Sequence, residues 1–230
     1  VVQRGLVRLR ETWLEMRQFQ DLRRLLISIF FSMAGIAIIV SFAFIYGAQV
    51  IQWDDSVRTM MFVIVQFNAA VGAIAFGILQ SRLGSRFTYM LSQGLWVVAI
   101  LAIWLTPEIA ALAREQLDVN WQAQYVFLFA GCLAGLSLGS AQSAGRALVG
   151  LLTPAGKSAE FFGMWGTAAK LAAVFGMLGL GLLQTFFGLA DAILFCLVLF
   201  AVSMWVVSSV DETRGRAAAD QWCEPNEGKK

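Results

Sequence analysis

Six long apolar segments constrain the fold of this 230-residue chain more than any other feature of its sequence. A helix rises about 1.5 Å per residue, so about 20 apolar residues cross a hydrocarbon core about 30 Å thick. The expected spans are residues 25–50, 58–80, 87–106, 123–143, 161–184 and 187–210. The sequence therefore predicts an all-α membrane protein with six transmembrane helices.

The basic residues lie in alternate connections between these spans. If the N-terminal arm is cytoplasmic, all 17 Lys and Arg residues except Arg58, Arg114 and Lys170 fall on the cytoplasmic side. Cytoplasmic loops of membrane proteins carry an excess of Lys and Arg. The pattern predicts a multi-pass protein with both termini in the cytoplasm. The simplest location is the bacterial cytoplasmic membrane, with an organelle membrane as the alternative.

The composition agrees with this class and argues against others. Hydrophobic residues make up 59% of the chain and charged residues 14%, against about 45–50% and about 25% in soluble domains. The net charge of +2 indicates no nucleic-acid partner, because the basic residues lie in loops beside lipid. Histidine is absent and the cysteines have no C-x-x-C spacing, which disfavours zinc, haem and Ser-His sites. We expect no enzyme activity, cofactor or metal.

Two segments lie outside the span-bearing region 25–210. In residues 1–24, Leu6, Leu9, Trp13 and Met16 share one helix face. This arm is expected to be an amphipathic linker, either on lipid headgroups or against another cytoplasmic segment. The tail, residues 211–230, is expected to be disordered. Because the chain does not begin with Met, we expect it to be part of a longer protein.

Small residues gather on particular spans. Gly131, Gly135 and Gly139 recur every four residues in the fourth span, and the fifth is rich in glycine and alanine. Such faces let helix backbones approach closely in lipid. The third and sixth spans carry few glycines, so they are expected at the periphery. Two triplets of opposite topology predict a 3+3 inverted repeat.

The connection between the second and third spans carries a motif. It runs from Gly77 to Arg86 and includes Arg82 and Gly84. It resembles the cytoplasmic loop signature of the major facilitator superfamily, in which this loop contributes to a charge-relay latch. Ser81 stands where an acid is usual. An ordinary basic turn is the alternative interpretation.

A second motif begins at the end of the fourth span. Gln142 and Arg146 are followed by Pro-Ala-Gly-Lys-Ser-Ala-Glu-Phe-Phe-Gly-Met-Trp, from Pro154 to Trp165, and then by Lys170. This pattern resembles the second half of the autophagy-related vacuolar effluxer-like branch of the superfamily. Residues 30–35 depart from the branch, because they lack the tyrosine and acid that it often has there.

The resemblance covers residues 25–210 and implies half of a twelve-helix major-facilitator fold. It implies the C-terminal half of a secondary transporter, whose partner is the missing N-terminal half or a second copy. Its expected activity is alternating-access transport, as efflux, of a small polar solute such as an amino acid. The alternative is a complete six-helix membrane subunit that dimerises or scaffolds a partner without transporting anything itself.

Polar side chains within the spans are the candidate substrate contacts. Lys170 lies near mid-membrane in the fifth span, where a charge costs about 2.5–3.5 kcal/mol on an insertion scale. We expect it to point into the bundle and contact an anionic group, unless it pairs with the missing half or snorkels to the inner face. Gln66 is the second candidate. Asn68 is expected to join helices, and Gln93 to be structural.

Residues at the expected cytoplasmic ends are interpreted as a gate rather than as substrate ligands. Glu160 begins a helix, where an acid complements the helix dipole, and it could also pair with Arg146. The alternative is that these residues order the loops. The gate residues are Arg82, Gly84, Arg86, Gln142, Arg146, Lys157 and Glu160.

Overall fold

The computed structural model describes residues 18–117 and 122–222. The predicted amphipathic face of residues 6–16 lies outside these ranges. Every element within them is a helix. Five helices are long and apolar enough to cross a membrane, or six when Phe195–Ser208 and Glu212–Asp220, which bend by 63°, count as one span. The structure therefore agrees with the predicted all-helical membrane class.

The helices follow the predicted spans, with two additions. In chain order the described elements are α2 (Gln20–Tyr46), the π-helical η1 (Gly47–Ile51), α3 (Asp55–Leu83), α4 (Ser85–Trp104), α5 (Thr106–Leu117), α6 (Ala123–Leu152), the 3-10 turn η2 (Ala155–Lys157), α7 (Ser158–Ala192), α8 (Phe195–Ser208) and α9 (Glu212–Asp220). The additions are α5 and α9.

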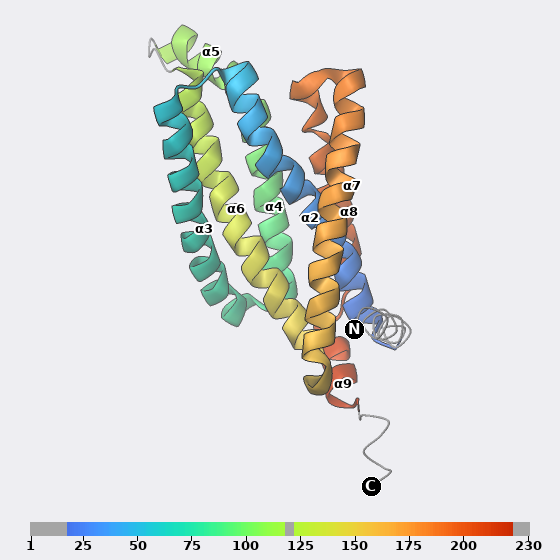
Figure 1. Cartoon of the computed structure of the whole chain (residues 1–230). Coiled ribbons are helices and arrows are strands. Elements are labelled where there is room, and N and C mark those ends of the chain that lie inside the picture. The colour runs from blue at the N-terminus through green and yellow to red at the C-terminus, as the bar shows by residue number, and fades with distance from the viewer. Residues whose placement is uncertain (1–17, 118–121, 223–230) are drawn as a thin grey trace.

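The helices form one bundle, with α5 at one end and α9 at the other (Figure 1). α6 packs against α3 and α4, whereas α2 packs against α7 and α8. α4 and α8 also contact each other, so they join the two groups. The start of α2 lies at the same end of the bundle as α9.

Two glycines with positive φ mark sharp breaks between helices. Gly84 alone separates α3 from α4, with φ 85° and ψ 158°. Gly188 interrupts the path of α7, with φ 81° and ψ 171°. These angles favour glycine because it has no Cβ to clash with the backbone. The predicted fifth span ends at residue 184 and the sixth begins at 187, so the second break lies at the start of the predicted sixth span.

The predicted glycine face of the fourth span packs against α3. An added Cβ at Gly135 would lie 2.6 Å from the carbonyl oxygen of Val65. One at Gly139 would overlap the carbonyl oxygen of Ala69. The close approach of these backbones therefore depends on the absence of side chains, as the glycine spacing predicts.

The glycine-rich fifth span divides into two parts. An added Cβ at Gly176 would lie 2.6 Å from the carbonyl oxygen of Ala34 in α2, so this glycine permits close packing. Gly163, Gly166 and Gly181 have no neighbour within 4 Å of such a Cβ. These three glycines leave part of α7 open in this chain.

The third span is more buried in this chain than a peripheral position requires. α4 buries the bulky side chains of Tyr89, Trp96 and Ile100, whereas α3 buries only three residues of its 29. The large side chains of α4 fill the space between helices, whereas α3 meets α6 through small residues, which bury little area. The most exposed long helices are therefore α3 and α7.

Both additional helices fall in segments without a long apolar run. Pro107 lies in the first turn of α5, where the missing N–H of proline is tolerated. α9 lies in the tail, so the prediction of disorder is wrong for Glu212–Asp220. The Asp211 side chain caps α9 by accepting hydrogen bonds from the backbone N–H groups of Thr213 and Arg214. The hydrogen bonds from Arg214 and Thr213 hold the pKa of Asp211 below its ordinary value.

A buried polar cluster joins α2, α4 and α8. The Ser28 hydroxyl donates to the Ser203 carbonyl oxygen at 2.9 Å, and the hydroxyls of Ser32 and Tyr89 lie 2.8 Å apart. All four residues are buried. Because an unpaired buried polar group costs about 1–3 kcal/mol, these side chains stabilise the bundle only as a paired set.

We expect Tyr89→Phe to lower the free energy of unfolding by about 1 kcal/mol, because it removes one buried hydrogen bond and keeps the ring. The measurement is denaturant unfolding of the purified protein in detergent. Tyr125→Phe is the matched control, since Tyr125 is 55% exposed. An equal loss in the control would contradict a stabilising role for the cluster.

Candidate functional site

An open groove of about 650 Å³ lies between α3 and α6. Gln66 comes from α3, while Gln142 and Arg146 come from successive turns of α6. The groove thus brings together one predicted substrate contact and two residues predicted for the gate. The other lining residues are Ala69, Ala73, Leu138, Gly139, Ser143 and Ala147.

A second cavity, of about 370 Å³, adjoins this groove, because Gln66, Leu138 and Gln142 line both. Few polar groups in a mostly apolar cavity are typical of small-molecule sites. The aromatic side chains that line the second cavity are Phe44, Trp53, Phe62, Trp96 and Phe127.

Arg146 has two close neighbours in the groove region. Its Nη2 donates to Gln142 Oε1 at 3.0 Å. Its guanidinium carbon lies 5.4 Å from the ring centre of Trp165 in α7, within the range of a cation–π contact. Among the described residues Glu160 pairs with Lys157, at 3.7 Å, and not with Arg146. The predicted gate residues of α6 therefore form one set, and those at the start of α7 form another.

Lys170 does not line either cavity. It is exposed on α7 beside Leu171 and Val174, which are 60% and 59% exposed. It lies on the same helix as the open Gly163 and Gly166. The expectation that Lys170 points into the bundle does not hold within this chain, because no described helix covers this part of α7.

The amides of the two neighbouring α3 residues behave differently. Gln66 is exposed to both cavities, as a substrate contact requires. Asn68 Nδ2 donates to the carbonyl oxygen of Ile64 at 2.9 Å, within the same helix. Asn68 therefore does not join two helices through its amide, contrary to the expectation. Gln93 is fully buried in α4.

The turn between α3 and α4 is tied to the start of α9. The Glu212 carboxylate accepts hydrogen bonds from the backbone N–H groups of Ser85, at 3.4 Å, and Arg86. Arg86 Nη2 also donates to the Ser208 carbonyl oxygen at the end of α8. The Glu212 carboxylate therefore contacts the α3–α4 loop, the same loop in which Ser81 stands where the superfamily motif usually has an acidic residue. Arg82 is exposed and makes no ion pair within the described residues.

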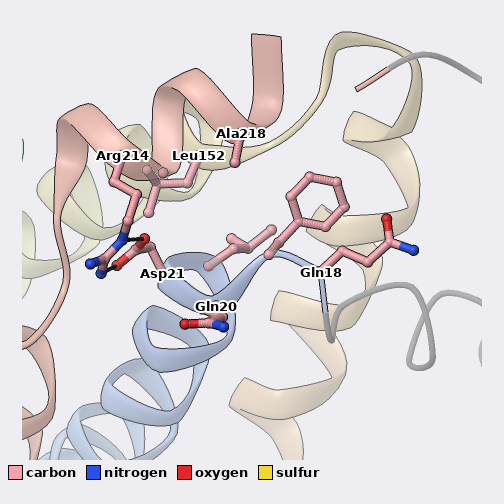
Figure 2. Close-up of a pocket in the computed structure, with 9 residues that line it drawn as sticks. Gln18, Gln20, Asp21, Leu152, Arg214 and Ala218 are labelled. Atoms are coloured by element: carbon pink, nitrogen blue, oxygen red, sulfur yellow. Dashed lines mark hydrogen bonds and ion pairs between the residues drawn. The ribbon is translucent and has the colours of Figure 1, made fainter. Parts of the chain in front are cut away.

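Figure 2 shows a second contact of α9, a bidentate ion pair between Arg214 and Asp21 of α2. Arg214 Nε and Nη2 donate to the two Asp21 carboxylate oxygens at 2.8 and 2.6 Å. Asp21 also accepts a hydrogen bond from the backbone N–H of Asp211 at 3.0 Å. The hydrogen bond to Asp21 raises the pKa of Arg214. The pair borders a pocket of about 250 Å³.

α9 also packs against α6, which belongs to the group of α3, α4 and α6. An added Cβ at Gly215 would lie 2.6 Å from Leu152 Cδ2 in α6. After the helix, the Trp222 ring centre lies 5.2 Å from Lys157 Nζ, in the connection between α6 and α7. α9 therefore contacts both groups of helices at one end of the bundle.

A comparison with protein families identifies the chain. The model described as "Vacuole effluxer Atg22 like" matches residues 1–220. The chain belongs to this family. In this Atg22-like chain, three residues of the second motif lie close together. Gln142 and Arg146 line the groove, and Trp165 lies beside Arg146.

Relatives of this Atg22-like chain are named as transport or autophagy proteins. An uncharacterized MFS-type transporter of Bacillus subtilis, YxiO, is 25% identical over 217 residues, which cover 93% of this chain and 46% of the relative. Autophagy-related protein 22 of Saccharomyces cerevisiae is 25% identical over 218 residues, covering 94% and 40%. The chain thus spans less than half the length of these curated relatives. No solved structure matches it significantly.

The family and the apolar helices together make this Atg22-like chain an integral multi-pass membrane protein of a transport family. Sequence reasoning missed the contacts of Glu212 and the pairing of Asp21 with Arg214. The sequence does carry one signal for the start of α9. Asp211 is a residue type that caps helices, and it stands directly before a run that is compatible with a helix. No local signal marks the partners that α9 meets.

Proposed function

We propose that this chain is half of a secondary transporter that moves a small polar solute, such as an amino acid, by alternating access and in the direction of efflux. The observation that carries the proposal is the groove in which Gln66, Gln142 and Arg146 meet. A few converging polar groups beside an apolar cavity suit a small solute. Membership in a family described as vacuole effluxers supports transport.

We also propose that α2–α4 and α6–α8 form a 3+3 inverted repeat. Exchanging the triplets pairs α2 with α6, α3 with α7 and α4 with α8. The packing of α6 on α3 and α4 then corresponds to the packing of α2 on α7 and α8. The breaks at Gly84 and Gly188 also correspond, and their backbone angles agree closely. Such repeats are common in secondary transporters.

A partner half, or a second copy, is proposed to cover α3 and α7. Phe67 of α3 and Leu178 of α7 are 69% and 66% exposed. Lipid could cover these side chains equally well. The open Gly163 and Gly166 favour a helix instead, because small residues in membrane helices mark sites of close approach. Lys170 on this helix would then contact the partner or the solute.

We propose that the predicted gate residues at the cytoplasmic end act as a gate, and that both termini lie in the cytoplasm. Two groups of contacts at this end support the gate. Arg86 and Gly84 lie at the α3–α4 turn with Glu212, and Lys157 with Glu160 lies where α7 begins. The residues 25–210 would form the transport unit. Arg82 remains exposed at the same turn.

The test is efflux by the native full-length protein in proteoliposomes loaded with a labelled amino-acid mixture. We expect Gln66→Leu and Lys170→Met each to slow efflux about tenfold, the change that about 1.4 kcal/mol of lost interaction produces. Phe129→Leu is the control, because Phe129 is exposed on α6 but lines neither cavity.

Two outcomes would contradict the proposal. Unchanged efflux in both variants would remove these residues from the solute path. Absence of efflux by the unmodified protein, for every amino acid in the mixture, would favour a six-helix subunit that dimerises or scaffolds a partner.

A further inference from the structure

We infer that Arg146 binds the anionic end of the transported solute, and that the solute is an organic anion whose apolar body lies in the adjoining cavity. The inference rests on the proposed function, because it assigns a ligand class to the same groove. It adds a cationic contact at Arg146, which lines the groove, whereas Lys170 lines neither cavity.

Charge is the first argument. Arg146 is the only charged residue among the described residues that line the two cavities. No carboxylate of the described chain pairs with it. An exposed arginine in an open groove beside an apolar cavity, without a protein anion, is suited to an anion from outside, since a guanidinium binds carboxylates through two parallel hydrogen bonds.

The orientation of the guanidinium is the second argument. Gln142 Oε1 accepts one hydrogen bond from Nη2, at 3.0 Å, and the Trp165 ring lies against the group at 5.4 Å. A guanidinium has five N–H donors, so donors remain free on Arg146. Gln142 and Trp165 therefore act as positioning residues that hold the group without saturating it.

The adjoining cavity supplies the third argument. It begins at Gln66 and Gln142, which also line the groove, and its walls include Trp53, Trp96 and Phe127. An apolar or aromatic body would fit there once the anionic end is held at Arg146. No Asp or Glu lines either cavity in the described chain. This half therefore offers an anion site without a matching site for an ammonium group.

The experiment measures binding to the native full-length protein in detergent by the rise in unfolding temperature. The probes are 3-phenylpropionate and its neutral amide, 3-phenylpropionamide, which share one apolar body. We expect the carboxylate to bind at least about tenfold more tightly than the amide. Arg146→Gln should remove this preference. Arg58→Gln should retain it, since Arg58 pairs with Asp55 at the far end of α3.

Arg146→Lys keeps a charge but loses the planar fork, so we expect weaker binding of the carboxylate with some preference retained. This variant answers the question if Arg146→Gln does not fold. Equal binding of both probes, no binding of either, or an undiminished preference in Arg146→Gln would each overturn the inference. Efflux that continues despite such a result would leave the proposed function standing. An Arg146-dependent preference without efflux would overturn only the proposed function.

Discussion

Gly139→Ala is expected to destabilise the protein by about 1–3 kcal/mol, the usual cost of forcing an extra methyl group into a packed interior. The added Cβ would overlap the carbonyl oxygen of Ala69, and backbone cannot rotate away as a flexible side chain can. α3 and α6 would have to separate, which would also loosen the contact at Gly135. The measurement is denaturant unfolding of the purified protein in detergent.

Gly94→Ala is the matched control for that substitution. It makes the same chemical change in another span, but the new Cβ meets no atom within 4 Å. Alanine is favoured over glycine in a helix by up to about 1 kcal/mol, so we expect unchanged or slightly higher stability. Equal losses at both positions would mean that the α3–α6 contact does not depend on Gly139.

Ala147→Trp is expected to reduce transport by the full-length protein more than about tenfold without unfolding it. Ala147 lines the groove and is exposed, so an indole at this position would occupy the space beside Arg146 instead of entering the packed interior. A solute that uses the groove would then be excluded by volume. The measurement is efflux from proteoliposomes, together with the unfolding temperature of the same preparation.

Val198→Trp adds an indole to an exposed position of α8 that lines neither cavity. Efflux should therefore fall in the Ala147 variant and persist in this control. Full efflux by a stably folded Ala147→Trp protein would place the solute path elsewhere. A loss of efflux in both proteins would indicate a general sensitivity to bulky exposed residues.

The positions of the spans were predictable because apolar length is a local property of the sequence. The same holds for the glycine face of α6, since Gly131, Gly135 and Gly139 must share a helix face whatever they pack against. The sequence also places Gly84 in the connection between the second and third spans. Its φ of 85° explains why glycine suits that position.

The candidate site could be predicted only in part, because its geometry depends on which helices meet. Glu212 reaches the α3–α4 turn across 126 residues of sequence, and no local pattern encodes that contact. Lys170 has small neighbours on its helix, but small residues do not say whether the helix that approaches them belongs to this chain. The sequence predicts a gate role for Arg146, since its position in the sequence does not reveal the groove beside it.

The docking of α9 has a practical consequence for handling the protein. Cutting the chain after Ser209 would remove the cation from the Asp21 carboxylate, which is only 3% exposed. The same cut would remove the acceptor for the amides of Ser85 and Arg86. Affinity tags and protease sites therefore belong beyond Trp222. A protein cut before α9 would lose both the ion pair with α2 and the hydrogen bonds to the start of α4.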